Sequence, residues 1–453
     1  MHATALNRRN RRIRRPAKPS DMANTGPRPS RPSSQGSDQL EEWLEAQQTN
    51  LLRHTAALRP FQRSEFGSGP EAPTEGHIQA VNRLIEQLRA PLESKAERMA
   101  GRIAQSLQAP NEAHLAAVVS DKERTHDHVR AIERVWDFYF ELFGQRQSRF
   151  GAWLLGCDRI ALDCYQHIFI NLGTARSIPA PPPFSYMRTG FSPATFRRGI
   201  PLRRLGQQLN PFPLIQLPYH RLVNPWTLGA ILHEVCHNIQ NDLELQVSVP
   251  RTIAYRLLQA GASRSVAMTW TGWNREIFAD LAGLLLGGPP IVGSLMDVIG
   301  RSSKATLRFS PGAPHPTPYL RALISCELLR RMGFPEEAEG YQRAWKRLYP
   351  RPSAGTIPHE LLASAPEAIR IVVDAICYRV YPSLGHKRLA DVIRFAPKEQ
   401  QMMQEAAQRL AAGTDPGVVP ERFLIGAIRL AFEQGLATPE QLTKQFYKEL
   451  ARR

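Results

Sequence analysis

The segment HEVCH, residues 233–237, holds two histidines four residues apart with a glutamate directly after the first. On an α-helix, residues four apart lie on the same face, so both imidazoles can bind one divalent metal ion. Glu234, offset by about 100° from His233 around the helix, can then act as a general base beside that ion. The pattern is short, and two histidines at the edge of a core helix are the structural alternative. The surrounding elements must decide between the two.

The sequence around this motif predicts a helix from Pro225 to Leu243. Asn224 suits the N-cap, and Pro225 suits the first helical position, where its missing N–H is not needed. At about 100° per residue, His233 and His237 lie roughly 40° apart, with a small alanine between them in projection. Apolar residues gather on the opposite side of the helix: Leu228, Ile231, Leu232, Val235, Cys236, Ile239 and Leu243. One face therefore suits the core, and the other leaves room for a metal ion and a water molecule.

A second segment, TGWNREIFADLAGLLLGGPP, supplies candidate partners for the two histidines. Glu276 and Asp280 are four residues apart on one helical face, and the small Ala279 and Gly283 would let this face approach another helix closely. The two glycines before Pro289 predict the end of the helix. A catalytic zinc ion needs three protein ligands and an open position, so a carboxylate from this helix would complete the set. The alternative, an acidic pair on a solvated face, fits poorly with so apolar a segment.

A third motif, HPTPYLR, places His315 and Arg321 in the spacing HPxxxxR. With HExxH, ExxxD and HPxxxxR in this order, the sequence resembles the gluzincin zinc metallopeptidases, and within them the prenyl-protein (CaaX) and heat-shock-associated branch. These motifs span residues 224–321. The block 174–224 also resembles the sequence that precedes HExxH in uncharacterised bacterial zincin-like proteins.

The resemblance implies a Zn²⁺ site with His233, His237 and Glu276 as ligands. It implies that Asp280 accepts a hydrogen bond from the second ring nitrogen of one ligand histidine and so fixes its tautomer. The implied reaction is metal-assisted hydrolysis of a peptide bond, in which Glu234 is the general base for the attacking water.

His315 and Arg321 would lie near the metal ion, where either could stabilise the oxyanion of a tetrahedral intermediate. Pro318 predicts the start of a helix that runs to Gly333, so Arg321 falls in its first turns. For Arg321, an ion pair with Asp280 or another buried acid is an equally good structural alternative.

The rest of the chain predicts helices that surround this site. Residues 38–173 and 336–453 carry apolar residues at spacings of three and four, as amphipathic helices do. Residues 174–335 form the predicted zincin-like catalytic core. Its Pro-rich part before residue 224 is mostly loop, with PLIQLP (213–218) as the best candidate for a strand. The predicted fold class is predominantly α with a small β region.

Residues 1–37 are rich in Arg, Pro, Ser and Gly and are predicted to be a disordered basic tail. They hold nine Lys and Arg against one Asp, which is nearly half of the net charge of +17. Such a tail could contact nucleic acid or another acidic surface, or it could be a solvated arm without a partner. The first case gives an alternative function: a non-catalytic protein that keeps a zincin scaffold for regulation or nucleic-acid binding.

The composition disfavours the disulfide-rich secreted class and the membrane-spanning class. The five cysteines are scattered without CxxC spacing, which favours reduced thiols in the cytoplasm. No apolar region follows the basic N-terminus, as a secretory signal would require. The best membrane candidate, LAGLLLGGPPIVGSLM (281–296), is broken by Gly-Gly-Pro-Pro and is shorter than the roughly 20 apolar residues of a span. We therefore expect a soluble protein that acts on a peptide or protein substrate.

Overall fold

The computed structural model describes residues 39–109, 111–173, 180–190 and 192–453. Within these residues the chain is predominantly helical and contains only short strands, as the spacing of its apolar residues predicts. The predicted basic tail, residues 1–37, lies outside the described residues. Among the described residues, no helix is long and apolar enough to cross a membrane.

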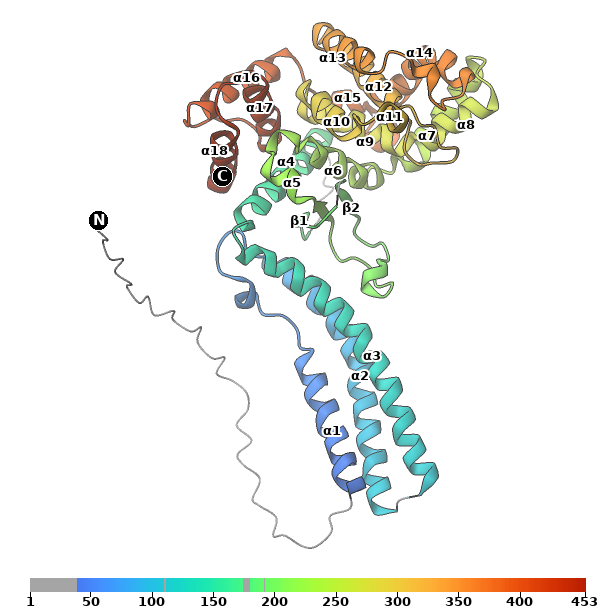
Figure 1. The fold of residues 1–453 in the computed structure, drawn as a ribbon, viewed down its shortest axis with the longest axis vertical. Helices are drawn as coiled ribbons and strands as arrows, with labels where there is room; N and C mark the ends of the chain where they lie inside the picture. Colours follow the sequence, from blue (N-terminus) through green and yellow to red (C-terminus); the bar gives the residue numbers. More distant parts are fainter. Residues whose placement is uncertain (1–38, 110, 174–179, 191) are drawn as a thin grey trace, which may run out of the picture.

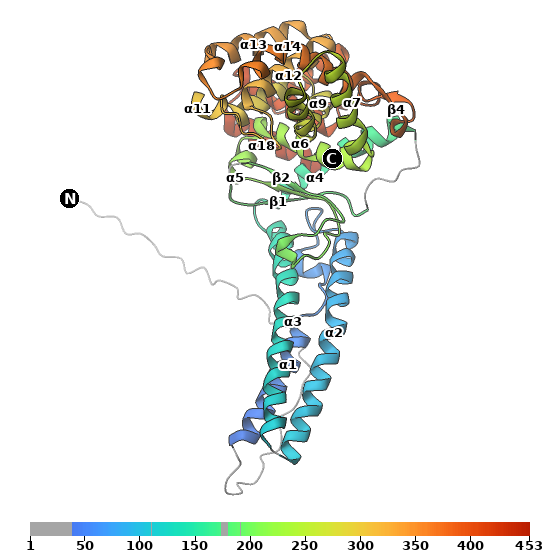
Figure 2. The same cartoon turned by 90° about the vertical axis from the view of Figure 1, so that its right-hand side faces the viewer.

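Three long helices, α1 (Gln39–Ala57), α2 (Glu75–Gln108) and α3 (Glu112–Gly144), lie side by side and form a stalk (Figures 1 and 2). Thr74 and Asn111 cap α2 and α3, because each side-chain oxygen accepts a hydrogen bond from a backbone N–H in the first turn. The apolar stripes of the three helices meet in a core of their own, which includes Leu44, Leu51, Leu92, Met99, Ile103, Val118, Val129 and Ile132.

A three-stranded sheet lies between the stalk and the remaining part of the chain, which we call the head (Figure 2). Its strands are β1 (Phe184–Met187), β2 (Ala194–Phe196) and β3 (Leu214–Leu217). The order is β1-β3-β2, with β1 parallel and β2 antiparallel to β3. The strand predicted at PLIQLP is β3. The other two lie in sequence that was predicted to be loop, because three or four residues are too few to show an alternating pattern.

The central strand β3 presents side chains to two different cores. Leu214 packs with aromatic residues of the stalk and with Phe184 of β1. Ile215 and Leu217 pack with the helices of the head. The sheet therefore joins the two bodies of the molecule through apolar contacts on both sides.

Helices make up most of the head, and their bounds in chain order are α4 (Gly151–Leu172), α5 (Tyr219–Val223), α6 (Gly229–Asp242), α7 (Leu245–Gln259), α8 (Arg264–Gly272), α9 (Asn274–Gly287), α10 (Pro290–Ile299), α11 (Ser303–Thr306), α12 (Pro318–Arg331), α13 (Pro335–Leu348), α14 (His359–Val373), α15 (Leu389–Val392), α16 (Pro397–Ala411), α17 (Glu421–Glu433) and α18 (Pro439–Arg452). A second, two-stranded sheet pairs β4 (Val380–Tyr381) with β5 (Lys387–Arg388).

One continuous apolar core runs through the head, from Leu154 of α4 to Leu450 of α18. Within it, α4 packs against α6, and α17 packs against α9. The predicted boundaries after residues 173 and 335 therefore do not separate independent cores. Helix α4 from the first region and the helices after residue 335 pack in the same apolar core as the helices of residues 174–335.

The helix that carries HEVCH begins later than predicted. Pro225–Thr227 form a 3-10 turn, and α6 starts at Gly229. The side chain of Asn224 makes no capping hydrogen bond, because its Nδ2 instead donates to the backbone oxygen of His220 at 2.8 Å. Proline at the first position suits a 3-10 turn as well as an α-helix, so the sequence could not distinguish the two.

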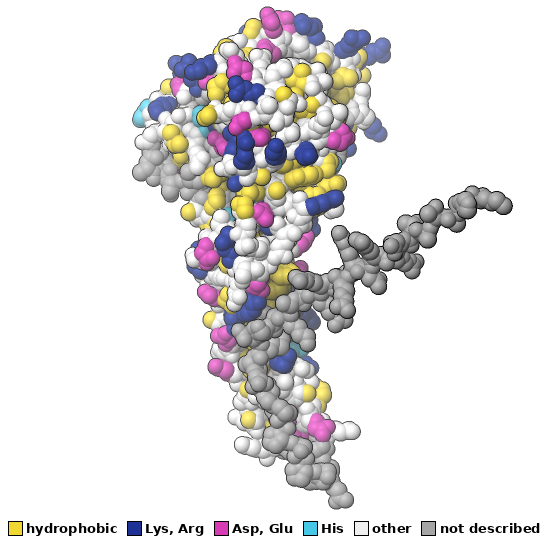
Figure 3. Space-filling view, turned by 90° about the vertical axis from the view of Figure 1, so that its left-hand side faces the viewer, with side chains coloured by type: hydrophobic (Ala, Val, Ile, Leu, Met, Phe, Trp, Pro, Cys, Tyr) yellow, Lys and Arg dark blue, Asp and Glu magenta, His cyan; other side chains and the backbone are white. Residues whose placement is uncertain are grey.

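Side chains of both charge signs are interspersed over the stalk and the head on the face drawn in Figure 3. Elsewhere in the described residues, opposite charges form ion pairs such as Arg59–Glu65 at 2.6 Å and Arg124–Asp121 at 2.9 Å. Positive charge is therefore not gathered into one patch on this face.

A partly buried polar network ties α17 to α4. Asp163 of α4 accepts hydrogen bonds from the backbone N–H and the guanidinium of Arg422, at 2.9–3.0 Å. The same guanidinium lies 3.1 Å from Nδ1 of His167. Burial, followed by the charge of Arg422, lowers the pKa of His167 to about 4.

We expect this histidine to make the fold sensitive to acid. Its ring is neutral when folded, but it binds a proton below about pH 6.5 when unfolded, so its contribution to stability is lost as the pH falls from about 6.5 towards 4. When the pH is lowered from 7.5 to 5, the unfolding free energy of the wild type should fall by about 1–2 kcal/mol more than that of His167→Gln. Urea denaturation at both pH values measures this. The exposed His359→Gln is the control, and an equal loss in wild type and His167→Gln would contradict the assignment.

Candidate metal centre

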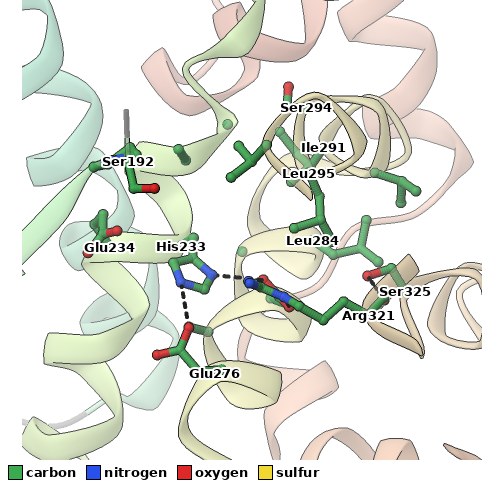
Figure 4. A pocket seen from close by; sticks show the side chains of 18 of the residues that line it. Ser192, His233, Glu234, Glu276, Leu284, Ile291, Ser294, Leu295, Arg321 and Ser325 are labelled. Carbon is green, nitrogen blue, oxygen red and sulfur yellow. Dashed lines mark hydrogen bonds and ion pairs between the residues drawn. The ribbon is translucent and has the colours of Figure 1, made fainter. Parts of the chain in front are cut away.

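The site is built where α6 and α9 cross at close range. A Cβ added at Gly283 of α9 would lie 3.3 Å from the backbone nitrogen of His233, so only glycine permits this approach without displacing a neighbour. The crossing brings the face of α9 that carries Glu276 and Asp280 against the face of α6 that carries the histidines. Figure 4 shows His233 facing Glu276 across this crossing.

Three side chains offer electron pairs to one small volume. The Nε2 atoms of His233 and His237 are 3.1 Å apart. The carboxylate of Glu276 lies 3.5 Å from the first of these nitrogens and 3.4 Å from the second. These three residues are also the only group of metal-ligating type found within the described residues. The structure therefore brings together the two histidines of HEVCH and the downstream Glu276.

The separations fit a tetrahedral ion. Zinc binds nitrogen at about 2.0–2.1 Å, which places two ligand atoms about 3.3–3.4 Å apart in a tetrahedron. The three observed separations lie within 0.3 Å of that value. Since unprotonated ring nitrogens and a carboxylate repel one another at this range, a cation or a shared proton must lie among them.

Asp280 fixes the orientation of His233. Its Oδ1 lies 2.8 Å from Nδ1 of His233, so this ring nitrogen carries the proton and Nε2 turns towards Glu276. Burial lowers the pKa of His233, but the hydrogen bond and the charge of Asp280 outweigh it and raise that pKa to about 10. Of the two histidines of HEVCH, His233 is therefore the one that Asp280 orients.

Arg321 makes the ion pair that was one of its two predicted roles. Its Nε and one terminal nitrogen each donate to Asp280 at 2.7 Å, a two-point contact between buried groups. Burial raises the pKa of Asp280, but Arg321 and His233 together hold it well below its usual range. The guanidinium thus keeps Asp280 ionised as the acceptor for His233.

His237 has a less complete environment. Its Nδ1 is buried and has no hydrogen-bond partner among the described residues. Burial and the charge of His233 lower the pKa of His237 to about 3, so the ring is neutral and able to donate an electron pair. The position of His237 thus rests on packing in α6, without the carboxylate support that His233 receives.

Glu234 lies beside the three candidate ligands but does not join them. It is only 7% exposed and lines the same cavity. None of the described residues forms a hydrogen bond or an ion pair with its carboxylate. Burial raises the pKa of Glu234 to about 7. A carboxylate with such a pKa can both accept and release a proton near neutral pH, as a general base must.

His315 approaches the site from the loop before α12. Its Nε2 lies 3.3 Å from Glu276, and its side chain is 63% exposed. It therefore lies at the mouth of the cavity, where an incoming molecule would meet it.

The cavity is also lined by residues that lie outside the three motifs and that the sequence did not point to. Ser192 and Pro193 come from the segment just before β2, and several apolar residues come from α10. All of these α10 residues except Val298 belong to the segment 281–296, whose apolar composition drew attention only as a membrane candidate. The prolines at its centre begin α10 instead, directly after α9 ends at Gly287.

Comparisons with models of known protein families, with curated proteins and with solved structures gave no match to this chain. The case for a function therefore rests on the site itself.

We expect purified protein to bind about one zinc ion per chain after equilibration with Zn²⁺. His237→Ala and Glu276→Ala each remove one of three ligands and should lose most of this metal. His359→Ala, an exposed histidine on α14, is the control and should keep it. Elemental analysis after dialysis measures the ratio. Full zinc retention in Glu276→Ala would show that this carboxylate is not a ligand.

The variant Asp280→Asn tests whether the carboxylate of Asp280 holds His233 in the orientation needed to bind a metal ion. An amide can still contact the ring, but it carries no charge and no longer pairs with Arg321. Loss of such a partner typically lowers metal affinity 10–100-fold, so we expect a zinc dissociation constant raised by about that factor. Competition with a chromogenic chelator measures it, with circular dichroism to verify folding. An unchanged dissociation constant in a folded variant would contradict this role.

Proposed function

We propose that the protein is a zinc-dependent peptidase that hydrolyses internal peptide bonds. The observation that carries this proposal is the convergence of His233, His237 and Glu276 at zinc-like separations, with the unpaired carboxylate of Glu234 beside them. The order of HExxH, ExxxD and HPxxxxR, which resembles the gluzincins, supports the same conclusion.

A zinc ion held by these three side chains would polarise a substrate carbonyl and lower the pKa of a water molecule. Glu234 accepts the proton of the attacking water and passes it to the amide nitrogen as the C–N bond breaks. His315, at the mouth of the cavity, is placed to donate a hydrogen bond to the carbonyl oxygen as negative charge develops there. Arg321 acts through Asp280 and is a positioning residue.

The sheet offers a place for an extended substrate. Within the described residues, β2 pairs with β3 on one edge and has no strand on the other. Its Thr195 accepts a hydrogen bond from Asn238 of α6 at 3.0 Å, so the strand runs alongside the helix that carries HEVCH. Ser192 and Pro193, just before β2, line the cavity. An extended peptide added to this edge would pass the metal centre.

Glu234→Gln tests the proposal directly. The amide cannot accept the proton, so we expect kcat to fall by about 10²–10⁴-fold while zinc content stays at the wild-type level. The control is Glu360→Gln, which alters the exposed glutamate of HELLA on α14, a segment that shares the first half of the motif but lacks the second histidine. Cleavage of an unfolded protein such as reduced casein, followed by mass spectrometry, measures activity.

Two results would reject the proposal. One is a zinc-loaded wild type that cleaves no peptide bond. The other is cleavage that Glu234→Gln leaves unchanged, because hydrolysis would then come from another site or a contaminant. Salt-sensitive DNA binding that disappears on deletion of residues 1–37, in the absence of hydrolysis, would favour the non-catalytic alternative.

A further inference from the structure

A second hollow, a groove, lies where α13 and α14 both pack on α12. In Figures 1 and 2 these two helices lie at the end of the head opposite the stalk. The volume of the groove is about 550 Å³, within the range of about 300–1,000 Å³ that is usual for small-molecule sites. Its lining on α12 extends from Tyr319 to Arg330, which corresponds to a length of about 16 Å along the helix.

The groove is separate from the metal centre, although α12 contributes to both. Arg321 and Ser325, four residues apart, line the cavity of the metal centre. Leu323 and Glu327 lie about 200° further around the helix and line the groove. None of the candidate metal ligands lines the groove, so a ligand there would not take part in the proposed hydrolysis.

The floor of the groove is apolar and recessed. It consists of Tyr319, Leu320, Leu323, Leu362, Ala365 and Ile369. Tyr319, Leu320 and Ile369 are no more than 6% exposed, so a broad partner such as a helix would bury little further apolar surface on them. Leu323 and Leu362 are half-buried, and a slim chain lying along the floor would contact both.

The rim of the groove is positively charged. It carries the exposed side chains of Arg330, Lys346 and Arg370 and one acid, Glu327. Three positive charges against one negative charge leave a net charge of +2. The single acid is already compensated, because Glu327 pairs with Arg330 at 3.5 Å and with Arg331 at 3.0 Å.

Two of the rim cations are available to a ligand. Lys346 of α13 and Arg370 of α14 form no ion pair with any of the described residues. The two side chains come from opposite walls of the groove. An anion between them would gain both charges without breaking an ion pair of the protein.

We propose that this groove binds a small anionic amphiphile, namely a free single-chain carboxylate of the fatty-acid class. The aliphatic chain lies on the apolar floor, and the carboxylate lies between Lys346 and Arg370. Each buried CH₂ group strengthens binding about 4-fold. The charge-assisted hydrogen bonds at the rim select an acidic head group. A helical peptide fits less well, because its apolar face would meet the charged rim before the recessed floor.

The test measures binding of dodecanoate to the full-length protein by isothermal titration calorimetry, below the micelle concentration. We expect one dodecanoate per chain. Its Kd should be at least about 10-fold lower than that of octanoate, which buries four fewer CH₂ groups. Dodecanol lacks the negative charge and dodecyltrimethylammonium reverses it, so both should bind at least about 10-fold more weakly than dodecanoate.

Variants of the groove separate the roles of rim and floor. Lys346→Gln and Arg370→Gln should each raise the Kd of dodecanoate about 10-fold and leave that of dodecanol unchanged. Leu323→Ala removes a contact with the chain and should weaken both ligands by the same factor. The matched control is Arg347→Gln, which alters an exposed cation of α13 that does not line the groove. It should keep the wild-type Kd, and circular dichroism verifies the folding of each variant.

Three results would overturn the proposal: no binding of dodecanoate up to its micelle concentration, equal binding of dodecanol and dodecanoate, or a wild-type Kd in both Lys346→Gln and Arg370→Gln. Binding of phosphatidylglycerol vesicles or of an acidic helical peptide, without binding of dodecanoate, would assign the groove to a membrane surface or to a protein partner and would also overturn it. None of these measurements depends on zinc or on peptide hydrolysis, so failure of the proposed function leaves this test intact.

Discussion

The carboxylate of Asp280 is the point on which the arrangement of the site depends. It accepts a hydrogen bond from His233 on α6 and two from Arg321 on α12, and so joins three helices at one buried position. Removal of one partner from such a buried pair costs about 3–5 kcal/mol, because a charge is left without compensation. The direction in which His233 presents its Nε2 is therefore set by the packing of α9 and α12, and not by α6 alone.

Burying so many charged groups requires strong apolar packing elsewhere on the same helices. On α6, the face opposite the histidines is fully buried, and α9 is buried from Glu276 to its end at Gly287. Glycines at the crossings allow the backbones to approach, so the polar faces meet directly without a layer of side chains between them. The hydrophobic effect along the outer faces thus holds the helices at the distance that the ligand geometry requires. The same close approach encloses the cavity that the candidate ligands His233 and Glu276 line.

Sequence reasoning succeeded where the pattern was local and long. The helices within residues 38–173, the end of α9 at Gly287 and the start of α12 at Pro318 follow from apolar spacing and from Gly and Pro positions. The resemblance to the gluzincin motifs named His233, His237 and Glu276, which the structure brings close together, but it did not assign Asp280 to one histidine. The strands β1 and β2 were missed because such short strands are stabilised by distant partners. The residues of α10 were missed because an apolar run reads the same whether it fills a core or lines a cavity.

The buried charges of the site also bear on which ion suits it. Glu234, Glu276 and Asp280 contribute three negative charges when ionised, and Arg321 contributes one fixed positive charge. The remaining charge of −2 is costly in a buried environment, and a divalent cation cancels it. Because two of the three candidate ligands are imidazoles, the set suits zinc better than calcium or magnesium, which prefer oxygen. A proton on His233 is the other way to place positive charge among these atoms, so metal binding must displace that proton and should weaken as the pH falls.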